Sequence, residues 1–170
     1  LPVGAVIASK EISEHFEAAR WWSGSTWDGH PLICATIVGN LEYMLANNIL
    51  QQVRQRGTYL KDRLDAVQAK HPSVGRVSGR GLFYTVDLVN GEGEPIVPED
   101  RYSAFTGDLS NLPNNIIASE NAKRGVFMGG FTPNTIKLGP PFTITQDEID
   151  LALDSFDQAL DIIDDKFLKS

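Results

Sequence analysis

Two hydroxyl side chains, Ser25 and Thr26, stand shortly before a proline in the run Gly24-Ser25-Thr26-Trp27-Asp28-Gly29-His30-Pro31. Pro31 suits the first turn of a helix, because its missing N–H leaves no hydrogen bond unmade there. Hydroxyls and unpaired N–H groups near a helix N-terminus favour a bound anion, because the donors and the helix dipole act in the same direction. An ordinary helix cap, with Thr26 or Asp28 accepting from the helix's own N–H groups, explains the same pattern. From these residues alone, both interpretations stay open.

The rest of the sequence offers no second group with the spacing of a catalytic or metal site. Cys34 is the only cysteine, which excludes a disulfide within the chain and a cysteine-rich metal site. The aspartates that recur from Asp147 to Asp164 have the spacing of a solvated helix face, and we expect them not to converge. No metal-ligand spacing such as His-Glu-x-x-His includes any of the three histidines, His15, His30 and His71. We therefore expect no bound metal.

Composition and charge narrow the class of protein. A net charge of −7 and a pI near 4.9 argue against a nucleic-acid binder, which needs a basic face. No apolar run approaches the roughly 18–20 residues that span a membrane, so we expect no membrane association and a cytoplasmic protein. Residues Leu1 to Ser9 lack the basic start and long apolar core of a signal peptide. They resemble the interior of a longer protein, and we expect the chain to be part of one.

The elements around the hydroxyl pair alternate between strand and helix. Gly4 to Ala8 has the composition of a short buried strand, and Ser9 to Arg20 places apolar residues on one helical face. Residues 21 to 30 form a loop rich in glycine, serine and tryptophan. A helix from Pro31 to Asn47-Asn48 follows, and a second helix from Ile49 ends at His71-Pro72.

The second half of the chain predicts shorter elements and one long final helix. Thr145 and Glu148 form the pattern of a capping box, and apolar residues from Ile149 to Phe167 then follow at helical spacing. The other expected elements are a strand at Leu82–Val89 entered through a glycine bend, a loop over residues 90–114, a helix to Arg124 and strands at Val126–Met128 and Thr135–Leu138.

This order of elements predicts a mixed α/β chain in two parts. Residues 1–48 form the end of one layered α/β domain whose other strands are absent from the sequence. Residues 49–170 are long enough to form an α+β domain with its own core.

Five segments in this order resemble the class III aminotransferases, the ω-aminotransferase group of fold-type I enzymes that use pyridoxal 5′-phosphate. They are LPVGAVIAS, STWDGHPLICA, VGRVSGRGL, AKRGVFM and LGPPFTITQDEID, which together extend over nearly the whole chain. The resemblance implies the C-terminal part of such an enzyme, in which residues 1–48 end the large cofactor-binding domain and residues 49–170 form the small domain.

The resemblance also assigns roles to individual residues. In the family, the segment that matches Ser25-Thr26 reaches across a homodimer interface, and its threonine binds the cofactor phosphate of the neighbouring subunit. It thus implies that Thr26, assisted by an N–H of Ser25 or Thr26, binds this phosphate. The Schiff-base lysine of the family lies a few residues before the segment matching Leu1 to Gly4, so this chain contains no catalytic lysine. Lys10 follows that segment and does not replace it.

A second set of residues is implied at the substrate pocket. Many relatives carry an arginine for a substrate carboxylate after the strand that matches Val126–Met128, where this chain has Gly129, Gly130 and Phe131. We expect these three residues and Trp27 to shape the pocket. Trp21, Trp22 and Trp27 crowd one loop, at a place where the active-site mouth and the subunit interface of the family adjoin.

The resemblance therefore implies an aminotransferase that moves an amino group from an amine or amino acid to a 2-oxo acid such as pyruvate. Because this chain lacks the lysine, we expect it to be inactive by itself. Two alternatives stay open: a non-catalytic module or degenerate paralogue that self-associates, and one chain of a split enzyme.

Overall fold

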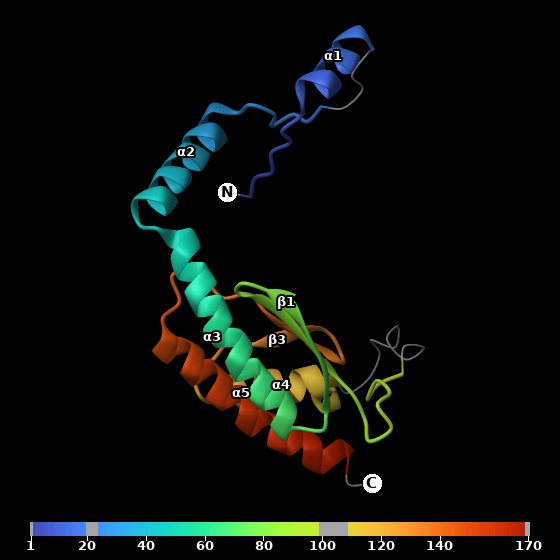
Figure 1. Cartoon of the computed structure of the whole chain (residues 1–170). Helices are drawn as coiled ribbons and strands as arrows, with labels where there is room; N and C mark the ends of the chain where they lie inside the picture. The colour runs from blue at the N-terminus through green and yellow to red at the C-terminus, as the bar shows by residue number, and fades with distance from the viewer. Residues whose placement is uncertain (1, 20–23, 99–108, 169–170) are drawn as a thin grey trace. The chain divides into compact units, whose positions relative to one another are not determined.

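A computed structural model describes residues 2–19, 24–98 and 109–168, and it divides the chain into two compact units, Leu1–Asn48 and Ile49–Ser170 (Figure 1). Part of the expected loop over residues 90–114 lies outside the described residues, as do Trp21 and Trp22. In the described residues, no helix has both the length and the apolar character that a membrane span requires.

Unit 1 contains two helices, α1 (Lys10–Ala18) and α2 (Pro31–Ala46), neither of which has a buried residue. The expected strand at Gly4–Ala8 is wrong: these residues form no strand, and Val6 and Ile7 are 95% and 97% exposed. A strand needs hydrogen-bonded neighbours, and no strand of the described residues pairs with this segment. The described residues of unit 1 thus include exposed apolar side chains and form no buried core.

In the described residues, unit 2 is a four-stranded antiparallel sheet with two long α-helices and one shorter one. Its strands lie in the order β1-β2-β4-β3. Two strands differ from expectation, because β1 was not predicted and β3 starts after the predicted segment Val126–Met128. The elements are α3 (Ile49–Lys70), β1 (Val74–Arg80), β2 (Phe83–Leu88), η2 (Leu109–Asn111), α4 (Pro113–Ala122), β3 (Gly129–Thr132), β4 (Thr135–Leu138) and α5 (Gln146–Phe167).

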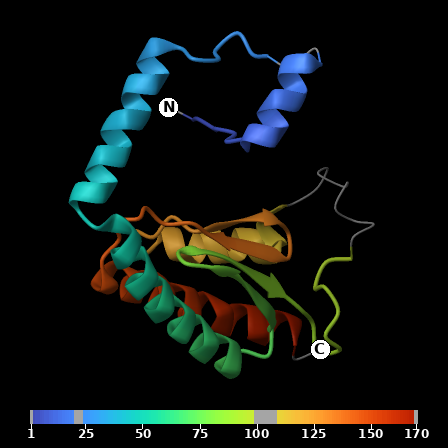
Figure 2. The ribbon, with the colours of Figure 1, turned by 45° about the horizontal axis from the view of Figure 1, so that its top comes forward.

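The core of unit 2 lies between one face of the sheet and the helices α3, α4 and α5 (Figure 2). Alternation along β2 selects this face, because Tyr84, Val86 and Leu88 are buried whereas Phe83 is 53% exposed. From the helices, Leu64, Phe156 and other fully buried residues fill the opposite side. The capping box that starts α5 is confirmed, with the Thr145 hydroxyl oxygen accepting from the Glu148 N–H at 3.2 Å.

Gly57 allows α3 to pack directly on the turn between β1 and β2. A Cβ at this position would lie 2.7 Å from the carbonyl oxygen of Gly81, which is backbone and cannot move aside. Gly57→Ala should therefore destabilise unit 2 by about 1–3 kcal/mol, although alanine favours a helix by about 1 kcal/mol. Urea unfolding measures this. Thr58→Ala, a substitution at an exposed position of the same helix, is the control and should lower the free energy of unfolding far less. Equal free energies of unfolding for Gly57→Ala and wild type would contradict the close packing at Gly57.

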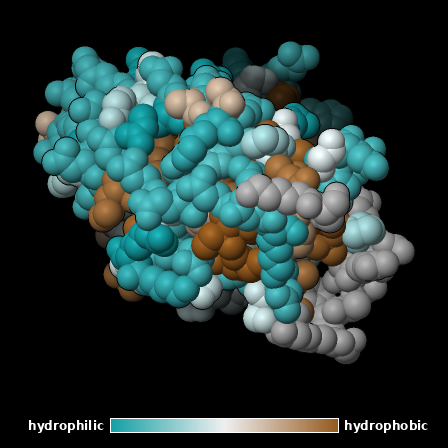
Figure 3. All heavy atoms as spheres, turned by 90° about the horizontal axis from the view of Figure 1, so that it is seen from below, coloured by the Kyte–Doolittle hydropathy of each residue, from teal (hydrophilic) through white to brown (hydrophobic). Residues whose placement is uncertain are grey.

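The aspartates of α5 meet basic residues of α3 instead of facing only water, which corrects the expectation of a plain solvated face. Arg63 pairs with Asp150 and Asp154, and Lys70 pairs with Asp157. The surface seen from below, where α5 lies in Figure 1, is mostly hydrophilic with apolar patches between the polar side chains (Figure 3). These ion pairs hold α3 and α5 side by side above the core.

Acid should weaken this contact at Asp157. Partial burial favours the neutral acid, but hydrogen bonds from Lys70 and His71 outweigh it and hold the pKa of Asp157 below its ordinary value. A lowered pKa contributes stability above the unfolded value of about 3.9, and this stability is lost as the pH falls through the folded value. Asp157→Asn should remove that acid-dependent part of a urea titration. Asp62→Asn, at an exposed aspartate of α3, should retain it; equal acid profiles of wild type and Asp157→Asn would refute the contribution.

Candidate functional site

Hydrogen bonds within the loop before α2 fix the position of Thr26. The N–H of Asp28 donates to the carbonyl of Ser25 at 3.1 Å, which closes a β-turn with Thr26 and Trp27 at its tip. The N–H of Ser25 donates to the Asp28 carboxylate at 2.7 Å, and the Ser25 hydroxyl oxygen accepts from the N–H of Trp27 at 3.3 Å. Ser25 and Asp28 are therefore used inside the turn. This role of Asp28 was not predicted, although serine and aspartate are both frequent turn residues.

Thr26 is exposed, and its hydroxyl makes no hydrogen bond with any described residue. The predicted cap of α2 by Thr26 or Asp28 is wrong, because the Nδ1 atom of His30 accepts the N–H of Leu32 at 3.2 Å instead. Gly29 shapes the approach with a φ of 65°, and Pro31 occupies the first turn. With the cap supplied by His30, the threonine hydroxyl stays available to an external acceptor.

Trp27, the second residue at the tip of this turn, has 62% of its surface exposed. Its ring contacts the imidazole of His30, with the centroids 5.1 Å apart. An exposed tryptophan beside a hydroxyl that bonds no described residue is suited to contact with another polypeptide or ligand. The role of Trp27 in a substrate pocket stays a prediction.

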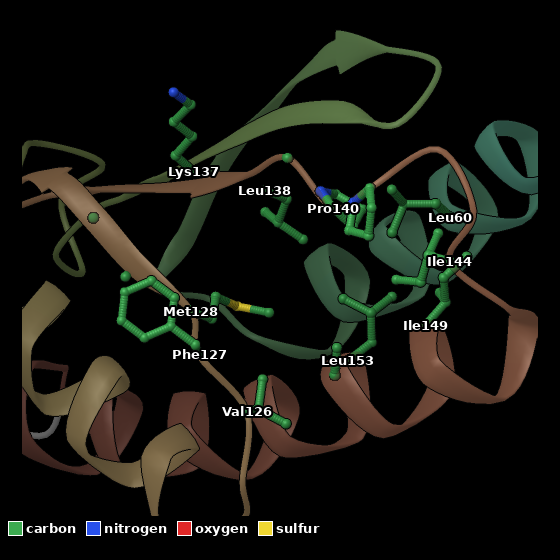
Figure 4. A pocket seen from close by; sticks show the side chains of 15 residues that line it. Leu60, Val126, Phe127, Met128, Lys137, Leu138, Pro140, Ile144, Ile149 and Leu153 are labelled. Atoms are coloured by element: carbon green, nitrogen blue, oxygen red, sulfur yellow. The ribbon is translucent and has the colours of Figure 1, made fainter. Parts of the chain in front are cut away.

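Of the residues expected at the substrate pocket, Trp27 belongs to unit 1, whereas Gly129, Gly130 and Phe131 lie on strand β3 in unit 2. Gly129 and Gly130 line a cavity of about 600 Å³, together with apolar side chains that include Met128, Leu138 and Leu153 (Figure 4). In Figure 4 the Lys137 side chain points away from these residues, and its Nζ atom lies 5.1 Å from the ring centroid of Phe83. The cavity wall is therefore predominantly apolar. Phe131 belongs to β3, but its side chain lies outside the described residues.

Gly130 leaves no room for a side chain. A Cβ there would lie 2.5 Å from the carbonyl oxygen of Thr135 and 2.6 Å from the Cβ of Asn114. At Gly129, by contrast, a Cβ would make an ordinary 3.8 Å contact with Ala118. Tight packing of α4 against β3 thus accounts physically for the glycine at position 130.

The donors of the described loop fit a supplementary contact to a phosphate and do not form a complete phosphate site. The Thr26 hydroxyl is a neutral donor, and the one carboxylate beside it, that of Asp28, is already bound to the Ser25 N–H. A phosphate dianion needs several donors or cations, and the described residues 24–30 contain no lysine or arginine. The loop can therefore supplement a phosphate site whose main part belongs to another segment or subunit.

Comparison with known proteins identifies the family of the chain. The sequence pattern of the family described as "Aminotransferase class-III" matches residues 1–160. An acetylornithine aminotransferase from Bacillus subtilis is 31% identical over 159 residues, which cover 94% of this chain and 35% of the relative. Among solved structures, an S-selective transaminase from Arthrobacter sp. matches with a TM-score of 0.80 and 34% identity, covering 92% of this chain and 34% of that one.

A further structure is similar at lower identity. It is a taurine:2-oxoglutarate aminotransferase from Bifidobacterium kashiwanohense, in complex with PLP and glutamate, with 26% identity and a TM-score of 0.77 over 93% of this chain. The mixed helix and strand fold is thus that of PLP-dependent transaminases of fold type I. The chain spans about a third of the length of the relatives it matches.

Proposed function

Because the chain belongs to the class III aminotransferases, we propose that it forms the C-terminal part of an enzyme that transfers an amino group from an amine or amino acid to a 2-oxo acid such as pyruvate. The intact enzyme is a cytoplasmic homodimer with pyridoxal 5′-phosphate. Residues 1–48 complete its large cofactor-binding domain, and residues 49–170 form its small domain.

Thr26 binds the phosphate of the neighbouring subunit's cofactor. The observation that carries this assignment is its exposed hydroxyl at the tip of a hydrogen-bonded turn, with no bond to a described residue. Because Asp28 holds the N–H of Ser25 at 2.7 Å, an assisting backbone contact falls to the N–H of Thr26. The turn fixes the hydroxyl before the cofactor arrives, which lowers the entropic cost of binding.

The bound cofactor supplies an electron sink for the reacting carbon. The lysine that exchanges protons with that carbon belongs to another part of the intact enzyme. Lys10 is unsuited to this role, since it lies on the surface of α1 and its Nζ is 3.5 Å from the carboxylate of Glu14. On the substrate side, the segment Gly129-Gly130-Phe131 borders the pocket.

Borohydride reduction tests whether the lysine that binds the cofactor belongs to a segment outside this chain. The chain by itself, incubated with pyridoxal 5′-phosphate and reduced, should carry no stoichiometric modification on any single lysine in a peptide map. The intact enzyme should carry one stoichiometrically modified lysine, upstream of residue 1. A stoichiometric adduct on a lysine of this chain would overturn the assignment of the lysine to another segment.

A self-associating module without catalytic activity is the second candidate. It is favoured by the exposed apolar side chains of unit 1, among them Val6, Ile7 and Leu45, which are 95%, 97% and 73% exposed. Sedimentation of the chain with and without the upstream segment separates the two. The enzyme proposal predicts that the intact protein is a defined dimer that binds the cofactor, whereas the module predicts association without cofactor binding.

A further inference from the structure

His71 follows α3 directly and is 1% exposed, with both nitrogens of its ring facing carboxylates. Its Nδ1 atom lies 2.7 Å from Oδ2 of Asp164, and its Nε2 atom lies 2.9 Å from Oδ1 of Asp157. The two aspartates are two helical turns apart on α5 and so lie on one face of that helix. A single buried ring thus joins the end of α3 to two turns of α5.

The second oxygen of each carboxylate is also engaged. Oδ1 of Asp164 accepts the N–H of Ser73 at 3.2 Å, and Oδ2 of Asp157 accepts from Nζ of Lys70. These donors stabilise ionised carboxylates, and the pKa of Asp157 is lowered despite its partial burial. Ionised carboxylates only accept hydrogen bonds, so the ring must donate from both of its nitrogens.

A neutral imidazole has only one N–H, and its other nitrogen would direct a lone pair at a carboxylate oxygen in a buried site. We propose that His71 is an imidazolium in the folded chain and acts as a pH-sensitive latch that holds the C-terminal half of α5 against the end of α3. When the ring carries both protons, it donates one hydrogen bond to each carboxylate. When one proton is lost, the lone pair of that ring nitrogen repels the carboxylate oxygen that faces it.

The charges around the ring make this latch sensitive to its proton. Lys70 comes from α3, Asp157, Asp161 and Asp164 come from α5, and the turn into β1 contributes the N–H of Ser73. With His71 charged, two cations face three carboxylates; with His71 neutral, a single cation faces all three. Since Leu160 and Ile163 of the same helix segment are fully buried, release of the segment exposes part of the core.

Urea unfolding of the full chain as a function of pH tests the latch. If the folded chain keeps this proton, unfolding releases it above about pH 6.5, the reference value of a free histidine. The folding equilibrium constant of wild type should then fall, by up to about tenfold per pH unit, as the pH rises into the alkaline range. His71→Gln should be flat over this range, and Asp164→Asn should reduce the slope. Asp161→Asn, which removes an exposed aspartate that does not contact the ring, should keep the wild-type slope.

The ring nitrogens give a second readout that needs no variant. In ¹⁵N NMR spectra of the folded wild-type chain at neutral pH, both ring nitrogens of His71 should have the shifts of protonated nitrogens, with exposed His15 as the reference. One unprotonated nitrogen at His71 would overturn the proposal. So would wild-type stability that does not change over the alkaline range. If His71→Gln fails to fold, the NMR result on wild type decides.

Discussion

A polypeptide truncated to residues 49–170 should fold with nearly the stability that unit 2 has in the full chain, whereas a peptide of residues 1–48 should show no cooperative unfolding. All buried apolar side chains of the described residues lie in unit 2, from Ile49 to Ile163. Helices α1 and α2 have no buried residue, and isolated helices of their length are marginal in water. Circular dichroism melts of both fragments and of the full chain measure this.

Deleting unit 1 removes none of the buried apolar residues of the described core, so the midpoint of unit 2 should shift by no more than a few degrees. Leu64→Ala in the 49–170 fragment is the positive control, because loss of a fully buried leucine costs about 2–5 kcal/mol. A cooperative transition in the 1–48 peptide, or loss of structure in the 49–170 fragment, would contradict the division of the chain into a dependent and an independent unit.

In the intact enzyme, Thr26→Val should weaken pyridoxal 5′-phosphate binding by about tenfold to a hundredfold. A hydrogen bond to a charged group contributes about 1.5–3 kcal/mol, and valine matches threonine in shape but has no hydroxyl. The change should act on cofactor affinity without unfolding the loop, since Ser25 and Asp28 close the turn without the Thr26 side chain. Equilibrium titration of the apoenzyme with cofactor measures the effect.

Two matched variants separate the phosphate contact from general damage. Thr26→Ser keeps the hydroxyl and should recover most of the affinity. Thr36→Val removes another exposed threonine hydroxyl of the same unit, one that bonds the carbonyl of Leu32 within α2 at 2.8 Å, and should leave cofactor affinity unchanged. Equal affinities of Thr26→Val and wild type would remove Thr26 from the phosphate site.

The helices were predictable because their signals are local. Pro31 marks the start of α2, Thr145 and Glu148 cap α5, and the apolar spacing after Ile149 places the buried face of that helix. The cap residue of α2 could not be predicted, because His30 is an uncommon cap residue and the Asp28 carboxylate is bonded inside the turn. Local sequence preference therefore predicted the helix correctly but assigned its N-cap to the wrong residue.

The strands were harder to predict because pairing partners decide them. β1 contains two glycines and has weak strand preference, but its pairing with β2 places Val77 opposite Val86. β3 was expected at Val126–Met128, yet pairing with β4 starts at Gly129, and only a glycine fits between Asn114 and Thr135 at position 130. The segment Gly4–Ala8 has strand composition and no partner strand among the described residues.

The α5 aspartates show the same limit for charges. Helical spacing correctly placed them on one side of the helix, but the basic residues that meet them belong to α3, about ninety positions earlier in the chain. Sequence spacing reports which side chains share a face, whereas the partner of that face depends on tertiary packing.

Mixed dimers of the intact enzyme test most directly whether Thr26 serves the neighbouring subunit's cofactor. One subunit carries Thr26→Val and the other lacks the cofactor-binding lysine; each homodimer should bind the cofactor weakly. If Thr26 acts across the interface, the mixed dimer contains one complete site, and tight cofactor binding should return at half of the sites. If mixing restores no tight site, Thr26 does not reach the partner's cofactor.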